Sequence, residues 1–447
     1  MKIFFILICL FCGFKIFTNT GQKRFEWCVC SMLLLSSSIT MLESPHIQSH
    51  RFFILCYWAS IIYRKEYKRS KFPFTVIFGI YLVITLLIGW HDKLLTPFSR
   101  LWKPFAFMLD GYATIALAFW GTRNVKINSK WIVYSLYFVT LYGIFTLVTH
   151  FDPIQQITAN TFSPDGYFGA YYFGDRTRIG STWSHPISYG FICAIFSVLM
   201  LNHLKEKKIR ILYVLLLINV LICGSRTALA AVILMTAIYL LLRYNVSKLA
   251  KISLLLIPVL TFVYIAVPPV SKKIDSVVNT ATGNSDVGGS SLDMRDEQMA
   301  AALMIFSQSP VWGHGPDYIQ ENMMSDKKLM QAYYQEGYSF YGFESYSYVL
   351  LIERGIIGVV LEIILASCLV IYFYKNKKKN KLRVAEGLSI FLGFAFFALS
   401  TGALDSWIFT MFFVGLCMDR VKNGEPALNQ KPKNISLVHQ SMYGTTK

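Results

Sequence analysis

Charged residues are scarce in this sequence. They make up 15% of the 447 residues, whereas soluble globular domains carry about 25%. Hydrophobic residues reach 54%, and several apolar runs approach or exceed the ~18–20 residues that cross the hydrocarbon core of a bilayer. This composition excludes an ordinary soluble globule and predicts an all-α polytopic membrane protein.

The two long polar loops of the sequence lack cysteine, since all nine cysteines fall in apolar segments. This distribution argues against a disulfide framework and against a cysteine-based metal site. The sequence also lacks a phosphate-binding loop of the P-loop type. We therefore expect no cofactor and no required metal.

Thirteen apolar segments indicate how the chain crosses the membrane, and the polar connections divide it into regions. The segments lie near 2–18, 25–42, 51–63, 72–90, 103–120, 130–149, 185–203, 208–223, 227–243, 249–267, 344–374, 385–401 and 404–418. The predicted regions are N-terminal membrane helices (1–149), a first outer loop (150–184), central helices (185–267), a large outer loop (268–343), C-terminal helices (344–418) and a tail (419–447). We expect about 12–13 transmembrane helices.

Basic residues collect in the short connections. Five turns carry them, around 64–71, 123–130, 205–210, 243–251 and 375–383. All five fall on one side if each segment after residue 71 crosses once, and cytoplasmic loops are the ones that collect Lys and Arg. The net charge of +18 therefore indicates orientation and does not indicate nucleic-acid binding. The tail is expected in the cytoplasm and the two long loops outside it.

The large outer loop is acidic, with nine acidic and five basic residues over 268–343. Its net charge of −4 supports the predicted orientation. Within it, residues 293–309 read as a helix that Pro310 ends.

Arginines on the outer side are unusual under this orientation rule. Arg176 and Arg178 precede the 185–203 segment, and Arg226 lies in a tight turn between two membrane segments. A guanidinium held at the bilayer surface needs an anion and matches phosphate oxygens bidentately. The functional hypothesis is a clamp for the pyrophosphate of a lipid-linked donor. The alternatives are snorkelling to lipid headgroups and an internal pair with Asp175 or Asp405.

Glu344 lies at the membrane edge, directly before an apolar run. A carboxylate there could act as general base on a sugar hydroxyl, or it could be a helix-start acid favoured by the helix dipole. His185 and His314 are further candidates for substrate contact. A histidine at a helix start is the alternative for the first, and a turn is the alternative for the second.

Aromatic residues collect in both outer loops, among them Trp183, Phe343, Tyr346 and Tyr348. Sugar rings stack on such side chains. An aromatic belt at the membrane interface is the other interpretation, and both can hold together.

Four motifs together resemble the O-antigen ligase and O-antigen polymerase superfamily of bacterial membrane enzymes. Residues 178–186 (RIGSTWSHP) are similar to the family's Arg-x-x-Gly-Thr-Phe-x-Asn-Pro, and Ser225-Arg226-Thr227 is similar to its Ser-Arg turn. Arg295 followed by residues 309–315 (SPVWGHG) resembles its Arg and Pro-x-x-Gly-x-Gly. Residues 344–346 (ESY) with 355–358 (GIIG) stand where the family has His-Asn-x-x-Leu and Gly-x-x-Gly.

The resemblance implies a GT-C-like architecture and inverting, metal-independent glycosyl transfer on the periplasmic side of the bacterial inner membrane. The implied donor is an undecaprenyl-pyrophosphate-linked glycan, with Arg178 and Arg226 at the family's pyrophosphate-binding positions and Arg295 as a further candidate contact. Membrane lipid is a second implied partner, and a chain-length regulator is a candidate one. The family's ligases carry His where this sequence has Glu344, which favours a polymerase.

Three functions follow as expectations. A polymerase of O-antigen or exopolysaccharide would move the glycan to a sugar hydroxyl of another lipid-linked repeat unit. A ligase would move it to lipid A-core or another acceptor. A transporter or flippase of lipid-linked glycans would need a polar path deep within several helices, where Asp110 and Glu362 are the notable charges.

Overall fold

A computed structural model describes most of the chain. The described residues are 1–43, 46–91, 96–162, 178–183, 185–245, 247–248, 271, 275, 290–319, 343–402 and 405–424. Of residues 91, 159 and 290–297, only the backbone is described.

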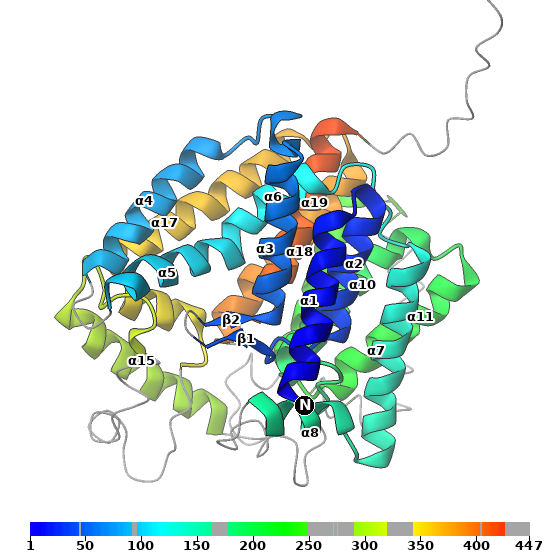
Figure 1. Ribbon diagram of the computed structural model, residues 1–447, viewed down its shortest axis with the longest axis horizontal. Helices are drawn as coiled ribbons and strands as arrows, with labels where there is room; N and C mark the ends of the chain where they lie inside the picture. Colours follow the sequence, from blue (N-terminus) through cyan, green and yellow to red (C-terminus); the bar gives the residue numbers. More distant parts are fainter. Residues whose placement is uncertain are drawn as a thin grey trace, which may run out of the picture.

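The described residues are helical almost throughout (Figure 1). The N-terminal half contains α1 (Lys2–Thr18), α2 (Gly21–Leu34), α3 (Ser49–Tyr63), the 3₁₀ turn η1 (Glu66–Lys68), α4 (Thr75–His91), α5 (Pro97–Met108), the π-turn η2 (Leu109–Ala113), α6 (Thr114–Gly121), α7 (Lys130–Thr149) and α8 (Pro153–Phe162). The C-terminal half contains α10 (Pro186–Met200), the 3₁₀ turn η3 (Leu201–His203), α11 (Lys207–Ile222), α12 (Arg226–Arg243), α15 (Ser290–Gln308), α17 (Tyr346–Lys375), α18 (Lys381–Ser400) and α19 (Trp407–Asn423). The predicted all-α class is confirmed.

Five described helices are long and apolar enough to cross a membrane, and α4 is a shorter apolar helix. The five are α7, α10 with η3, α12, α17 and α18. On the peripheral helices, large apolar side chains point outward, such as Val76 and Val83 of α4 and Trp131 and Phe138 of α7. Outward apolar surface is what a lipid environment accommodates. The predicted segment 249–267 lies outside the described residues.

The centre of the bundle is formed by α10, α18 and α19, which are buried on nearly every side. Aromatic rings join them. The rings of Phe191 and Phe397 stack at 4.2 Å, and those of Phe196 and Phe413 meet edge-on at 5.2 Å. Because these helices are enclosed by others, the residues at their ends are held by packing rather than by lipid.

The predicted segment 25–42 is shorter than expected, because α2 ends at Leu34. Serine hydroxyls bond to nearby backbone and compete with helix formation. Here the backbone N–H of Ser38 donates to the hydroxyl of Ser36, and the hydroxyl of Ser49 donates to the carbonyl of Ser36. The chain then forms a small antiparallel hairpin, β1 (Thr40–Leu42) and β2 (Ile47–Gln48).

The predicted segment 344–374 is interrupted. Gly355 has φ +58° and ψ −162°, a conformation open to glycine alone, and α17 kinks there. As a result, Tyr346 donates a hydrogen bond of 3.2 Å to the carboxylate of Glu362, although 16 residues separate them. A straight helix would place these residues about 24 Å apart along its axis. The first part of α17 is therefore folded back against the second.

The predicted basic turns meet at one end of the bundle, which we call the basic end. Lys422 donates to the carbonyl of Lys71, and Arg420 donates to that of Val125 at 2.6 Å. Asn128 bonds Glu206, Lys381 bonds Asn245, and Tyr372 near the end of α17 bonds Met418. In Figure 1 this end is at the top, and α8, α15 and the hairpin lie at the other end, which we call the site end.

Candidate functional site

Arg178 and Arg226 come together at the site end. Gly224 has φ +73°, and a Cβ added to it would be 2.6 Å from Cγ of Arg178. The side chain of Arg178 therefore lies against the turn that leads into Arg226. Ser225 caps α12 by accepting a hydrogen bond of 3.1 Å from the N–H of Ala228, so Arg226 stands in the first helical turn. The Arg178 side chain and the N-terminus of α12 therefore lie at one turn, and a helix N-terminus favours an anion.

His185 belongs to the same group of residues. Its Nδ1 accepts a hydrogen bond of 3.2 Å from the N–H of Ile187 and so caps α10. Burial, and next the charge of Arg178, lower the pKa of His185 to about 4. The imidazole is therefore neutral at physiological pH and holds the start of α10 beside Arg178. The helix-start interpretation of His185 accounts for this contact.

Glu344 lies at the site end, on the turn before α17, and its side chain is exposed. Its backbone N–H donates to Oε1 of Gln298 on α15 at 2.8 Å. The following residue, Ser345, caps α17 and donates from its hydroxyl to the carbonyl of Leu399 at 2.8 Å. Three elements therefore fix the backbone from which the Glu344 carboxylate projects.

The two halves of the site share one end of the bundle. α12 and α18 pack side by side and run in opposite directions, with Asn245 and Lys381 hydrogen-bonded at the basic end. Arg226 at the start of α12 and Ser400 at the end of α18 therefore both face the site end. Gly402 contacts the carbonyl of Phe343, directly before Glu344. The end of α18 therefore lies at the same end of the bundle as both Arg226 and Glu344.

Two glycine motifs of the sequence interlock through their backbones. The N–H groups of His314 and Gly315 donate to the carbonyls of Ile352 and Glu353 at 2.8 and 3.0 Å, and Ile356 donates to Pro310 at 2.9 Å. A Cβ on Gly355 would be 2.5 Å from the carbonyl oxygen of Val311. Only glycine fits where the kink of α17 meets the 309–315 turn.

His314 has a structural role in this turn. Its Nε2 donates to the carbonyl of Ile305 at 3.0 Å, and its ring stacks on Tyr318 at 4.4 Å. The buried carboxylate of Glu353 accepts from the backbone N–H groups of Asp317 and Ile319. These bonds fix the turn after α15. The turn interpretation of His314 therefore accounts for its contacts.

A buried polar cluster supports the first part of α17. Besides Tyr346, the hydroxyls of Tyr81 on α4 and Tyr112 in η2 donate to the carboxylate of Glu362. Arg354 lies 3.3 Å over the ring of Phe107 and bonds the Tyr81 hydroxyl at 3.4 Å. Because Tyr346 is two residues from Glu344, this cluster positions the candidate base.

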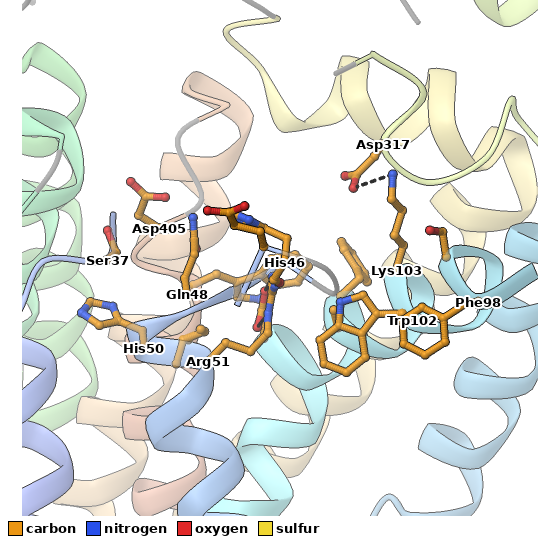
Figure 2. Close-up of a pocket in the computed structure, with 17 residues that line it drawn as sticks. Ser37, His46, Gln48, His50, Arg51, Phe98, Trp102, Lys103, Asp317 and Asp405 are labelled. Carbon is orange, nitrogen blue, oxygen red and sulfur yellow. Dashed lines mark hydrogen bonds and ion pairs between the residues drawn. The ribbon is translucent and has the colours of Figure 1, made fainter. Parts of the chain in front are cut away.

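A cavity of about 680 Å³ opens at the site end between the hairpin, α3, α5 and the start of α19 (Figure 2). Arg51 and Asp110 form an ion pair of 2.5 Å on one wall. Lys103 and Asp317 form another of 3.3 Å. Of the residues that line the cavity, the sequence analysis singles out Asp110 and Asp405. The cavity as a whole could not be predicted, because its walls come from segments more than 300 residues apart.

Two histidines of the cavity have a spacing that can occur in metal sites. His46 and His50 are separated by three residues, but α3 begins only at Ser49, so they do not share a helical face. The ring of His50 meets that of Trp183 at 4.9 Å and bonds the carbonyl of Leu35. Among the described residues, His, Cys, Asp and Glu form no cluster of three suited to a metal ion.

The remaining candidates cannot be placed in the site. Arg176 lies outside the described residues, and of Arg295 only the backbone is described, on α15. Thus the structure brings Arg178, His185 and Arg226 together and sets Glu344 at the same end of the bundle, while His314 serves the turn between α15 and α17.

A comparison with known families finds a match for the central part of the chain. Residues 211–363 match the family model Wzy_C, described as O-Antigen ligase. The matched region contains Arg226, the interlocked glycine motifs and Glu344. No curated protein matches the chain. The described helices are those of a multi-pass membrane protein, and within its 447 residues the segment 211–363 is similar to the O-antigen ligase family.

Proposed function

We propose that the protein is a surface-polysaccharide polymerase. In this proposal it transfers a glycan from undecaprenyl pyrophosphate to a sugar hydroxyl of another lipid-linked repeat unit, with inversion and without a metal. The observation that carries the proposal is the approach of Arg178 to the Gly224–Arg226 turn. It supports a site in which both arginines bind one anion, and a diphosphate is an anion that paired guanidinium groups match.

The proposed reaction needs one base and one anion site. Glu344 takes the proton of the acceptor hydroxyl, and that oxygen attacks the anomeric carbon of the donor. The bond between this carbon and the diphosphate oxygen breaks, and the electron pair leaves with the diphosphate. Arg178 and Arg226 stabilise the negative charge that develops there. Attack from the face opposite the leaving group inverts the anomeric centre.

The proposed location of the reaction is the periplasmic side. The basic turns gather at the end opposite the site, and basic connections face the cytoplasm in most membrane proteins. The proposed compartment is the inner membrane of a bacterium, because the proposed donor is carried on undecaprenyl pyrophosphate. A glycan delivered already activated on its carrier requires no nucleotide at that face.

A ligase is the second candidate, because the matched family model is described as O-Antigen ligase. Glu344 is the feature against it, since the ligases that the motifs resemble carry His there. The two functions leave different products when the gene is deleted. Loss of a polymerase leaves single repeat units on the final acceptor, whereas loss of a ligase leaves long chains on the carrier lipid.

The test replaces each charged group and measures glycan chain length by gel electrophoresis. We expect Arg178→Ala, Arg226→Ala and Glu344→Gln each to shorten the chains to single repeat units at normal protein levels. Matched controls at the basic end are Arg69→Ala and Glu206→Gln, which should keep long chains. Long chains in both arginine variants would reject the clamp, and full activity of Glu344→Gln would reject the base.

A further inference from the structure

The cavity of Figure 2 has the composition of a carbohydrate site. Its volume of about 680 Å³ falls within the range of ~300–1,000 Å³ typical of small-molecule sites. Hydroxyl, amide and carboxylate groups line it, including Ser37, Gln48 and Asp405. The aromatic side chains of Phe98 and Trp102 stand at the opposite end from Asp405. Rings that cover the apolar faces of a sugar, with polar groups around its edges, suit a polyol.

The charge of the cavity disfavours a diphosphate. In the described part of the chain, its lining contains two Lys or Arg residues and four Asp or Glu residues. Both basic side chains are engaged, Arg51 with Asp110 and Lys103 with Asp317. Burial, and next the charge of Arg51, lower the pKa of His46, so this ring is neutral at pH 7. The anion site at Arg178 and Arg226 and this cavity therefore have opposite electrostatic character.

Ring contacts connect the cavity with both parts of the proposed active site. His50 on its wall meets Trp183 at 4.9 Å, five residues after Arg178. Trp407, also on its wall, meets Tyr346 at 5.6 Å, two residues after Glu344. A sugar chain held in the cavity therefore lies beside the backbone that carries the candidate base.

We propose that this cavity binds the sugars of the acceptor glycan, as an uncharged or amino-sugar chain, and sets acceptor specificity. The inference rests on the proposed function, which requires a second substrate near Glu344. The donor's first sugar is bonded directly to the diphosphate and so belongs with the arginine pair. Of the lining residues, only Asp317 falls within the family match at 211–363, so the cavity is built mainly from segments outside it.

The binding test uses full-length protein in lipid nanodiscs and two probes. One is the free oligosaccharide released by mild acid from the lipid-linked repeat units of the producing cell, and the other is inorganic pyrophosphate. We expect Trp102→Ala and Asp405→Asn to weaken oligosaccharide binding by at least about tenfold, as for a buried aromatic anchor, with unchanged pyrophosphate binding. Arg226→Ala should show the reverse. Trp131→Ala, on the outer face of α7, controls for loss of an indole.

These two probes separate the two proposals. Retained pyrophosphate binding by Trp102→Ala demonstrates that the variant is folded. Equal oligosaccharide affinity in Trp102→Ala and Trp131→Ala, or no oligosaccharide binding by the unaltered protein, would overturn the cavity assignment alone. Unchanged pyrophosphate binding in Arg226→Ala would contradict the proposed function instead.

A kinetic test distinguishes acceptor sugars from donor sugars. The free oligosaccharide has no diphosphate, so it can be extended only as an acceptor. With membranes that supply the lipid-linked donor, we expect extended free glycan, and we expect Trp102→Ala to raise the oligosaccharide KM by about tenfold with little change in kcat. Inhibition by the oligosaccharide without its extension would place donor sugars in the cavity and contradict the proposal.

Discussion

Arg178 passes so close to Gly224 that no larger residue fits beneath it. A Cβ at position 224 would be 2.6 Å from Cγ of Arg178. The contact joins two segments that 46 positions separate in the sequence, and it brings Arg178 to the turn that presents Arg226. The geometry of the proposed diphosphate site therefore depends on a residue without a side chain.

Substitution of Gly224 should displace Arg178. In Gly224→Ala the new methyl group would push the arginine away, and the positive φ would add strain on the order of 1 kcal/mol. We expect pyrophosphate affinity to fall about tenfold, the equivalent of ~1.4 kcal/mol. Gly21→Ala is the matched control, because Gly21 also has positive φ (+50°) and has no atom within 4 Å of an added Cβ. If both variants bind pyrophosphate equally, the close contact has no functional role.

Substitution of Gly355 should loosen the interlocked glycine motifs. In Gly355→Ala the φ and ψ values of the kink become unfavourable by ~1–3 kcal/mol, and the methyl group meets the carbonyl of Val311. We expect a lower apparent Tm in detergent and reduced chain length. Gly79→Ala on α4, where an added Cβ meets nothing, should not lower the Tm. A wild-type Tm for Gly355→Ala would contradict the requirement for glycine at the kink.

The Tyr346–Glu362 bond should position Glu344. Removal of the Tyr346 hydroxyl in Tyr346→Phe costs one half-buried hydrogen bond, about 1 kcal/mol, and loosens the start of α17. We expect lower kcat with unchanged pyrophosphate affinity, because Arg178 lies in the segment before α10 and Arg226 lies on α12, away from α17. In the double variant with Glu362→Gln, Tyr346→Phe should lower kcat by less than it does as a single substitution. Both substitutions alter the same Tyr346–Glu362 hydrogen bond, so their effects should not add. If the losses in kcat are fully additive, Glu362 does not position Glu344 through its bond to Tyr346.

Protonation of His185 should destabilise the protein in acid. Its pKa is about 4 in the folded chain and about 6.5 when unfolded. The unfolded chain therefore binds a proton that the folded chain does not as pH falls from about 6.5 to about 4, and stability decreases over this range. We expect His185→Asn, which keeps a capping side chain, to reduce the loss of apparent Tm between pH 7 and pH 5. Identical pH dependence in both proteins would contradict a His185 that is neutral in the folded chain.

The order of helices and basic turns was predictable because hydrophobic run length and charge act locally. α1, α7 and α18 agree closely with their predicted segments, and the basic turns do meet at one end. Arg178 and Arg226 could be selected as candidates from the sequence, because arginines are unusual in connections on the outer side of a membrane.

Other features required the three-dimensional structure. The kink of α17 depends on the backbone of the 309–315 turn, which the local sequence around Gly355 does not contain. The walls of the cavity contain Arg51, Lys103 and Asp317, which are isolated charges in the sequence. Their ion pairs, Arg51 with Asp110 and Lys103 with Asp317, form only in the folded chain. His314 was a candidate for substrate contact because a histidine between glycines is conspicuous, yet its bond to Ile305 follows from the path of α15.

The proposed function requires that both arginines hold one diphosphate, and a structure determined with bound undecaprenyl pyrophosphate would show whether they do. We expect guanidinium nitrogens of Arg178 and of Arg226 within hydrogen-bonding distance of oxygens of the same diphosphate. A diphosphate bound elsewhere, or held by only one of the two arginines, would contradict it.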